Sequence, residues 1–328
     1  PATTTPTPSP HSPTPIPQSP FINPPLAERF GVSGSVYSIV PAREAGLPIS
    51  IYLNWNLIVE QPEAAQDLIF WQMVRLLEGE IRPDWEVIET AVRANPGSVW
   101  IVGNEPDVKW QDNTPPQQYA HLYHEVYTFI KEIDPTAQLA VTGVAQPTPL
   151  RLAYLDIVLE TYETSYGEPM PVDIWTVHNF ILREEFDSWG VEIPPGMDDR
   201  LALQFEVEDH DDLDIFRQHL HDFRDWMATR GYQERPLAVT EYGILMPVDF
   251  GYTPDVVAQF LLDTFPILMH ERSANGYPAD ANRLVQWWFW YSVYDTPDYY
   301  PTGNLYDRET GELTPIGQAF ADYVNSIP

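Results

Sequence analysis

The stretch Trp100-Ile-Val-Gly-Asn-Glu-Pro-Asp107 places a glutamate directly after a short apolar run. Residues 99–102 have the composition of a buried strand, and Gly103 and Pro106 bracket Glu105 at its C-terminal end. A carboxyl group held at such a strand end faces the mouth of a pocket. Burial there raises the pKa of a carboxyl group and suits it to donate a proton. The stretch therefore predicts a strand that ends in a chemically active glutamate.

On both sides of this stretch, short apolar runs alternate with helical stretches. The other predicted strands are 30–36, 49–55, 68–75, 138–142, 172–177, 237–240 and 285–291. The predicted helices are 84–94, 115–133, 150–166, 212–229, 255–270 and 316–324, with two weak ones at 41–45 and 62–67. Eight strands that alternate with eight helical connections predict an α/β fold with a parallel sheet, closed as a (β/α)8 TIM barrel.

Composition limits the partners of the chain. The 328 residues include 17 basic and 48 acidic residues, for a net charge of −31. Such a surface repels nucleic acid and anionic lipid, so we expect neither as a partner, although a high charge also serves plain solubility. The absence of cysteine excludes disulfides, thiolate chemistry and cysteine zinc sites. No apolar run approaches the roughly 20 residues of a membrane helix, so membrane insertion is not expected.

Residues 1–20 differ from the rest because they hold eight Pro, five Thr and three Ser. This composition predicts an extended linker before a barrel domain of residues 21–328. Such linkers commonly tether secreted domains to a cell surface or to other modules, and a plain disordered tail is the alternative. The linker favours an extracellular or cell-surface location. The first residue is Pro rather than Met, which favours a processed or trimmed fragment.

A second glutamate, Glu241, ends the apolar run Leu237-Ala-Val-Thr-Glu-Tyr-Gly243. In a TIM barrel the active site lies at the C-terminal ends of the strands. Strands four and seven stand nearly opposite each other, so Glu105 and Glu241 can meet over the barrel axis. Two facing carboxylates are the minimum required to hydrolyse a glycosidic bond. The alternative is two surface carboxylates in loops.

The motifs around both glutamates resemble those of the clan A glycoside hydrolases. Asn104-Glu105-Pro106 is similar to the acid/base motif of that clan, and Thr240-Glu241-Tyr242-Gly243 is similar to its nucleophile strand. The order of elements agrees along most of the chain, but only these motifs match specifically. The resemblance implies that Glu105 protonates the leaving oxygen and Glu241 attacks the anomeric carbon. It also implies retention of configuration and a carboxyl separation of about 5–5.5 Å.

The same resemblance implies several substrate contacts. Asn104 corresponds to an asparagine that binds the sugar 2-hydroxyl, and His178 to a histidine at the end of strand six, with a core histidine as the alternative. Phe180 stands where many members carry a tyrosine that donates to the nucleophile. Another donor is therefore expected, either Tyr242 or a loop tyrosine.

Aromatic and polar residues at other strand ends complete the expected site. Trp288 or Trp290 resembles the sugar-stacking tryptophan of the clan, with core packing as the alternative. The expected contacts at the rim of strands two and three are Asn54, Trp55 and Arg75. The loop 294–306 is rich in aromatic and hydroxyl groups, which suits a wall for sugars.

Metal sites are not expected. The loop 206–214 holds six acids, but it lacks the spacing of an EF-hand, so a solvated acidic loop is favoured over a calcium site. His121, His124 and Glu125 lie on one predicted helix in the wrong order for a His-Glu-x-x-His zinc motif, and we expect them to be structural.

The sequence thus predicts a secreted, retaining β-glycoside hydrolase that acts on a neutral oligo- or polysaccharide without a cofactor. Features of the sequence are shared by small clan members acting on β-glucans and by β-xylosidase and arabinofuranosidase relatives. Endo and exo action both stay open. The alternative is a catalytically silent carbohydrate-binding or surface-scaffold barrel.

Overall fold

Eight parallel strands form the centre of the molecule. The computed structural model describes residues 24–327. The strands of the central sheet are β1 (Phe30–Ser33), β2 (Ile51–Leu53), β3 (Ile69–Val74), β4 (Val99–Val102), β5 (Gln138–Val141), β6 (Trp175–His178), β7 (Leu237–Tyr242) and β9 (Trp287–Trp290). Their spatial order is β5-β4-β3-β2-β1-β9-β7-β6, and a parallel bridge between Ala140 and Ile174 joins the two end strands. The predicted (β/α)8 TIM barrel is confirmed.

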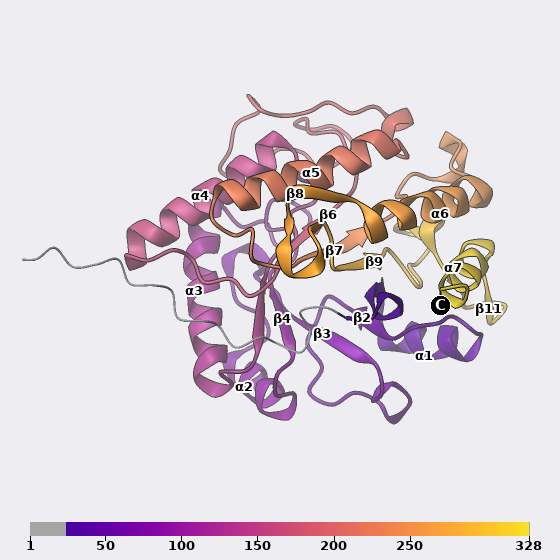
Figure 1. Cartoon of the computed structure of the whole chain (residues 1–328), viewed down its shortest axis with the longest axis horizontal. Helices are drawn as coiled ribbons and strands as arrows, with labels where there is room; N and C mark the ends of the chain where they lie inside the picture. Colours follow the sequence, from indigo (N-terminus) through magenta and orange to yellow (C-terminus); the bar gives the residue numbers. More distant parts are fainter. Residues whose placement is uncertain (1–23, 328) are drawn as a thin grey trace, which may run out of the picture.

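The helices lie around this barrel (Figure 1). They are α1 (Val36–Glu44), α2 (Trp85–Ala94), α3 (Pro116–Ile133), α4 (Pro149–Tyr166), α5 (Leu213–Thr229), α6 (Pro254–His270) and α7 (Pro315–Asn325). Four of them begin with proline, whose fixed φ suits the first turn and whose missing N–H would have no helical partner there. Within residues 24–327 no helix is long and apolar enough to cross a membrane.

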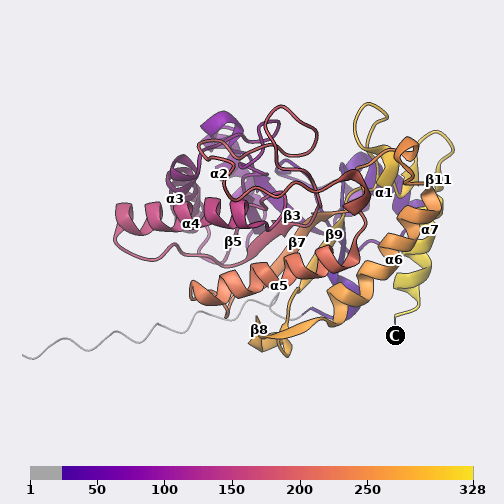
Figure 2. The same cartoon turned by 90° about the horizontal axis from the view of Figure 1, so that it is seen from above.

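Three local features differ from the predicted elements. The first strand ends at Ser33, and α1 begins at Val36 because the Ser35 side chain accepts a hydrogen bond from the backbone of Tyr37. The connection between β2 and β3 holds only a 3₁₀ turn, Glu63–Ala65, in place of a helix. An additional strand, β8 (Arg272–Tyr277), bridges to Arg283 outside the barrel and lies beside α5 (Figure 2). The predicted linker 1–20 and residues 21–23 lie outside the described residues.

Two apolar layers hold the barrel together. One fills its interior with alternate residues of the strands: Ile51, Leu53, Trp71, Met73, Val99, Ile101, Ala140, Ile174, Ala238, Trp287 and Phe289. The other lies between the strands and the helices, and contains the intervening residues such as Tyr52, Trp100, Val177 and Trp288. Since side chains alternate along a strand, the interior residues also determine which residues at the strand ends face the barrel mouth.

Candidate active site

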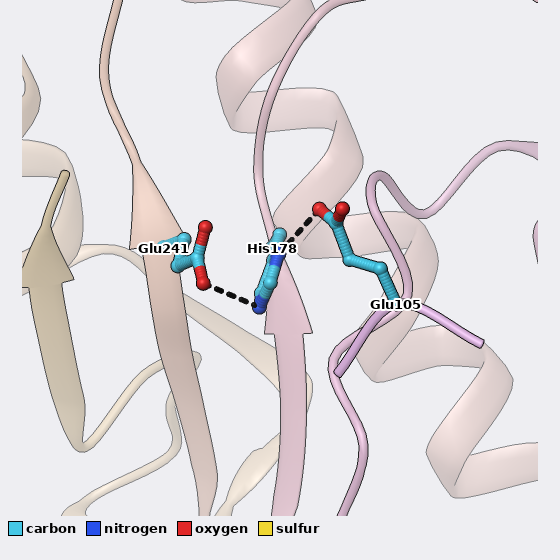
Figure 3. A group of neighbouring side chains, drawn as sticks. All are labelled: Glu105, His178 and Glu241. Atoms are coloured by element: carbon cyan, nitrogen blue, oxygen red, sulfur yellow. Dashed lines mark hydrogen bonds and ion pairs between the residues drawn. The ribbon is translucent and has the colours of Figure 1, made fainter. Parts of the chain in front are cut away.

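His178 lies between the two glutamates at the C-terminal end of the barrel (Figure 3). Its Nδ1 is 2.7 Å from Glu105 Oε1, and its Nε2 is 3.7 Å from Glu241 Oε1. One donor atom from each of the three residues lies within 4.8 Å of the other two. All three side chains are buried. The two carboxylates that the sequence placed on opposite strands therefore meet across one imidazole.

The backbone of Glu105 is held in an unusual conformation. Its φ is +43°, in the left-handed region that non-glycine residues seldom adopt. Its N–H donates to the carbonyl of Gly143, 3.1 Å away, at the end of β5. Asp112 accepts hydrogen bonds from the backbone of Asn104 and Leu76 and from the Arg75 side chain. These contacts fix the turn that presents Glu105, since such a strained residue persists only when its surroundings hold it.

Glycine at position 143 leaves space for the imidazole. A Cβ atom there would lie 2.4 Å from Cδ2 and 2.7 Å from Nε2 of His178. Both distances are shorter than real contacts allow, so only glycine lets His178 occupy its place between the carboxylates.

A β-bulge turns Glu241 toward the mouth of the barrel. The register of β7 against β9 shifts between Val239 and Tyr242, and its register against β6 shifts at His178. The extra residue changes the alternation, so Glu241 faces inward and Tyr242 faces the helices. There the Nε1 of Trp55, at the end of β2, donates to Glu241 Oε1 over 2.7 Å. Trp55 is thus the donor that the sequence led us to expect from Tyr242 or a loop tyrosine.

Burial and charge act together on the pKa values of Glu241 and His178. Burial raises the pKa of Glu241 to about 7; Glu105 adds to the rise, while His178 and the Trp55 hydrogen bond oppose it. Burial alone would lower the pKa of His178. The charges of Glu241 and Glu105, together with the hydrogen bond to Glu105, outweigh that effect and leave the pKa above its ordinary value. Glu241 and His178 therefore each hold a proton more readily here than in water.

A cavity of about 920 Å³ opens above these residues. Its aromatic lining combines residues at strand ends with residues of the loops: Trp55, Trp110, Phe180, Trp189, Phe250, Tyr291, Tyr299 and Tyr300. Polar groups reach it from Arg75, Glu105, Gln111, Glu241 and Asp295. Trp110 and Tyr299 are each 70% exposed, so flat apolar faces are available on the loops after β4 and after β9. Rings combined with a few polar groups suit the apolar faces and hydroxyl rims of sugars.

Of the residues predicted for the site, Glu105, Glu241, Trp55 and Arg75 line the cavity. The loop 294–306 also contributes to it, through Asp295, Tyr299 and Tyr300. Asn104 is buried beside Glu105, and its side-chain amide donates to Gln111 Oε1 over 3.3 Å. Asn54 lies off the cavity, where its Oδ1 accepts from the backbone of Asn56.

Three further predicted contacts, Trp288, Trp290 and Tyr242, are buried in the core instead. Trp288 packs edge-on against Phe30, and the Nε1 of Trp290 donates to the carbonyl of Gly303. Tyr242 packs against Trp290 and Phe216 in the layer under the helices. These three residues lie on the predicted strands, but their side chains face the helices. In β9 the side chains that face the barrel interior are those of Trp287 and Phe289. These residues belong to the core.

Tyr291, Trp110 and Trp189 line the cavity, although the sequence did not single them out. Tyr291 follows Trp287 and Phe289 at intervals of two, so it continues the inward face of β9. That alternation was the available signal for Tyr291. Trp110 and Trp189 lie on loops and had no comparable signal.

The acidic loop 206–214, expected to be solvated, and His121 and His124, expected to be structural, make contacts within the protein. Asp212 caps α5, Glu206 and Asp209 form a capping box on one 3₁₀ turn, and Glu206 also pairs with Arg183. His121 and His124 each lie within hydrogen-bonding distance of a tyrosine hydroxyl of α4.

Among residues 24–327, the cluster Glu105, His178 and Glu241 is the one group of three whose donor types suit a metal ion. However, His178 directs Nδ1 toward Glu105 and Nε2 toward Glu241, and a single metal ion could be ligated by only one of these two nitrogens. The arrangement fits proton sharing better than metal binding.

Neither a protein-family model nor a curated protein matches the chain. Solved structures do match. A GH128 (subgroup II) endo-β-1,3-glucanase from Pseudomonas viridiflava has a TM-score of 0.60 and 20% identity, over 92% of this chain and 98% of that one. A GH128 (subgroup I) endo-β-1,3-glucanase from Amycolatopsis mediterranei, in complex with laminaritriose, has a TM-score of 0.60 and 16% identity, over 90% and 99%.

A third match is a GH128 (subgroup III) curdlan-specific exo-β-1,3-glucanase from Blastomyces gilchristii, in complex with glucose. It has a TM-score of 0.58 and 18% identity, over 91% of this chain and 99% of that one. At these identities the likeness shows a shared fold along nearly the whole length of each chain.

Proposed function

We propose that the protein is a retaining glycoside hydrolase that cleaves β-1,3-glucan. The observation that carries the proposal is the pair Glu105 and Glu241, with oxygens within 4.8 Å of each other in an aromatic cavity at the barrel mouth. Retaining enzymes hold their carboxyl groups about 5–5.5 Å apart, whereas inverting enzymes leave about 6.5–9.5 Å for a water. The choice of β-1,3-glucan follows the activities named for the proteins of the same fold.

The reaction has two steps. In the first, Glu241 attacks the anomeric carbon while Glu105 gives its proton to the leaving oxygen, so the glycosidic bond breaks and a glycosyl ester forms on Glu241. In the second, the Glu105 carboxylate takes a proton from water, and the resulting hydroxide equivalent attacks the same carbon. The ester bond breaks, Glu241 leaves as a carboxylate, and Glu105 is protonated again.

Two observations bear on the assignment of roles in opposite directions. A pKa of about 7 at Glu241 would suit a proton donor. In contrast, the N–H of Trp55 points at Glu241 and stabilises its anion, as a nucleophile requires. We assign the nucleophile to Glu241 because that hydrogen bond is fixed by geometry, and because the motif at Glu105 resembles the acid/base motif of clan A.

The walls of the cavity support a neutral sugar chain as the ligand. Arg75 is the one basic side chain among the lining residues, and its Nε is 2.6 Å from the buried Asp112. A net charge of −31 disfavours polyanionic substrates. Aromatic faces on two separate loops provide stacking positions away from the carboxylates.

A screen of polysaccharides tests the proposal. Laminarin and curdlan are compared with β-1,4-glucan, xylan and mannan, and the products are resolved by length. We expect hydrolysis of the β-1,3-glucans, and loss of it in both Glu105→Ala and Glu241→Ala. If the wild-type protein binds laminarin but releases no product, the catalytically silent carbohydrate-binding barrel is correct instead. Phe180 in place of the tyrosine does not support that alternative, because Trp55 supplies the donor to Glu241.

We also propose that the enzyme acts outside the cell, tethered by the Pro/Thr-rich residues 1–20. The support is the composition of that segment. Fractionation of the source cells, followed by detection with an antibody against the barrel, tests this location. Recovery in the cytosolic fraction alone would contradict it.

A further inference from the structure

A buried ion cluster lies directly beneath the turn that carries Glu105. Arg151 of α4 contacts two carboxylates, Asp107 and Glu184, and the side chains of all three are fully buried. The Nε of Arg151 is 2.7 Å from Asp107 Oδ2, and its Nη1 pairs with Glu184 Oε1. Burial of charged groups is costly unless they are paired and hydrogen-bonded, so a cluster of this kind holds a specific arrangement.

The cluster joins three loops at the barrel mouth. Asp107 belongs to the loop after β4 and also accepts from the backbone of Ala145 in the loop after β5. Glu184 belongs to the loop after β6, and its Oε2 accepts from the backbone of Leu203. The Nη2 of Arg151 donates to the carbonyls of Val191 and Glu192, each 3.2 Å away. One guanidinium therefore holds the glutamate turn and the cavity wall around Val191 together.

Asp107 transmits this restraint to Glu105 through a single intervening residue, Pro106, whose φ is fixed by its ring. Glu105 itself has the strained φ of +43°, so its place depends on the contacts around it. Burial raises the pKa of Asp107 to about 6, and the charge of Arg151 opposes the rise. Loss of the guanidinium would thus also disturb the ionisation of Asp107.

We propose that Arg151 is a positioning residue for the general acid: it sets Glu105 at the distance and angle from which it can protonate the leaving oxygen. The inference rests on the proposed function. A lysine keeps the charge but lacks the planar fork that reaches two carboxylates and two carbonyls at once. Arg151→Lys should therefore displace Glu105 without leaving an uncompensated charge in the cluster.

The test is the leaving-group dependence of kcat/KM, measured with the full chain on aryl β-laminaribiosides. A 2,4-dinitrophenyl leaving group departs without protonation, whereas an unsubstituted phenyl group depends on the acid. General acid catalysis contributes about 10²–10⁴-fold, and a displacement of about 1 Å can cost 10²-fold. We expect Arg151→Lys to lower kcat/KM by about 10- to 100-fold on the phenyl glycoside and by less than about threefold on the dinitrophenyl glycoside.

Arg224→Lys is the matched control. Arg224 is equally buried, but it donates to the carbonyls of Leu284 and Arg235 and to Gln286, away from the cavity. This variant should lose stability and keep the wild-type ratio between the two substrates. Equal losses on both substrates in Arg151→Lys would overturn the inference while leaving the proposed function intact. Lack of wild-type activity on either glycoside and on laminarin would overturn the proposed function itself.

If Arg151→Lys does not fold, Glu184→Gln replaces it in the same measurement. The amide retains an acceptor for Arg151 and removes one charge of the cluster. The expected result is the same selective loss, confined to the phenyl glycoside. An unchanged ratio in a folded Glu184→Gln would overturn the inference.

Discussion

As the proposed nucleophile, Glu241 has to be buried to exclude water and yet ionised to attack. Burial raises its pKa to about 7, and the N–H of Trp55 is the directed contact that favours the anion. Trp55→Phe removes that donor and keeps the ring, so the pKa of Glu241 should rise further. A hydrogen bond to a charged group is worth about 1.5–3 kcal/mol, so the acidic limb of the pH profile of kcat/KM should move up by about one pH unit or more.

The matched control for this change is Trp110→Phe, which alters a tryptophan of the same cavity. Its acidic limb should coincide with that of the wild type. If the acidic limb of the kcat/KM profile does not shift in Trp55→Phe, the indole N–H does not govern the ionisation of Glu241.

The free energy of unfolding should also depend on the ionisation of Glu241. The folded pKa of Glu241 is about 7 and its ordinary value is 4.5, so the unfolded chain ionises first as pH rises. The resulting destabilisation is absent below the unfolded pKa, grows as pH rises, and is complete above the folded pKa. We expect Glu241→Gln to abolish activity and to raise the free energy of unfolding by about 1–3 kcal/mol at pH 8, but much less at pH 4.

Denaturant unfolding of Glu241→Gln at both pH values measures this difference. The exposed Glu63→Gln carries the same charge change on the surface and should have little effect at either pH. A Glu241→Gln variant that is less stable than the wild type at pH 8 would show that the carboxylate stabilises the fold.

At the scale of the elements, each strand and its following loop contribute separate parts of the site. The sequence identified the strands, and with them Glu105, Glu241, Arg75 and Trp55 at the cavity. It did not show which side of a strand each residue faces. The bulge in β7 turns Glu241 toward the barrel mouth and Tyr242 toward the helices, and the residues of β9 that face the interior are Trp287 and Phe289. Neither follows from the local residue types, because neighbouring tryptophans and tyrosines are equally apolar.

Trp110, on the loop after β4, is a candidate stacking position for a sugar away from the carboxylates. Lys109 lies over the Trp110 ring, 4.7 Å from its centroid, and the indole remains 70% exposed. If a sugar stacks on that indole, Trp110→Ala should lose about 1 kcal/mol of binding, which raises KM for laminarin about fivefold. KM for a short aryl glycoside should not change.

Initial-rate kinetics on both substrates check this. Tyr37→Ala removes an exposed aromatic side chain outside the cavity and should leave both KM values unchanged. An unchanged KM for laminarin in Trp110→Ala would exclude a sugar position on that loop.

On the scale of the whole molecule, the alternation of apolar runs and amphipathic helices was sufficient to predict the barrel. All eight barrel strands fall where the sequence indicates them, because a strand buried on both faces reads as a continuous apolar run. The weak connection between β2 and β3 and the additional β8 could not be predicted, since a barrel tolerates short or extended connections on its periphery. The composition of the cavity wall likewise depends on loops with no periodic pattern.

Because the net charge is −31, added salt should change the stability of the fold, whereas it should leave the binding of a glucan unchanged. Salt screens repulsion between surface charges, while a neutral glucan has no charge for salt to screen. Raising NaCl from about 0.02 to about 0.5 M should increase Tm and leave KM for laminarin within about twofold. Thermal unfolding and initial rates in a salt series measure both, and a KM that rises steeply with salt would instead indicate binding through charges.

The central claim is that Glu105 and Glu241 divide the work of acid and nucleophile. The measurement that tests it most directly is peptide mapping by mass spectrometry after reaction with a 2-deoxy-2-fluoro-β-laminaribiosyl fluoride, which forms the glycosyl ester but slows its hydrolysis. The assignment predicts one added disaccharide on the peptide that contains Glu241, and no adduct in Glu241→Gln. An adduct on Glu105, or on any other residue, would contradict it.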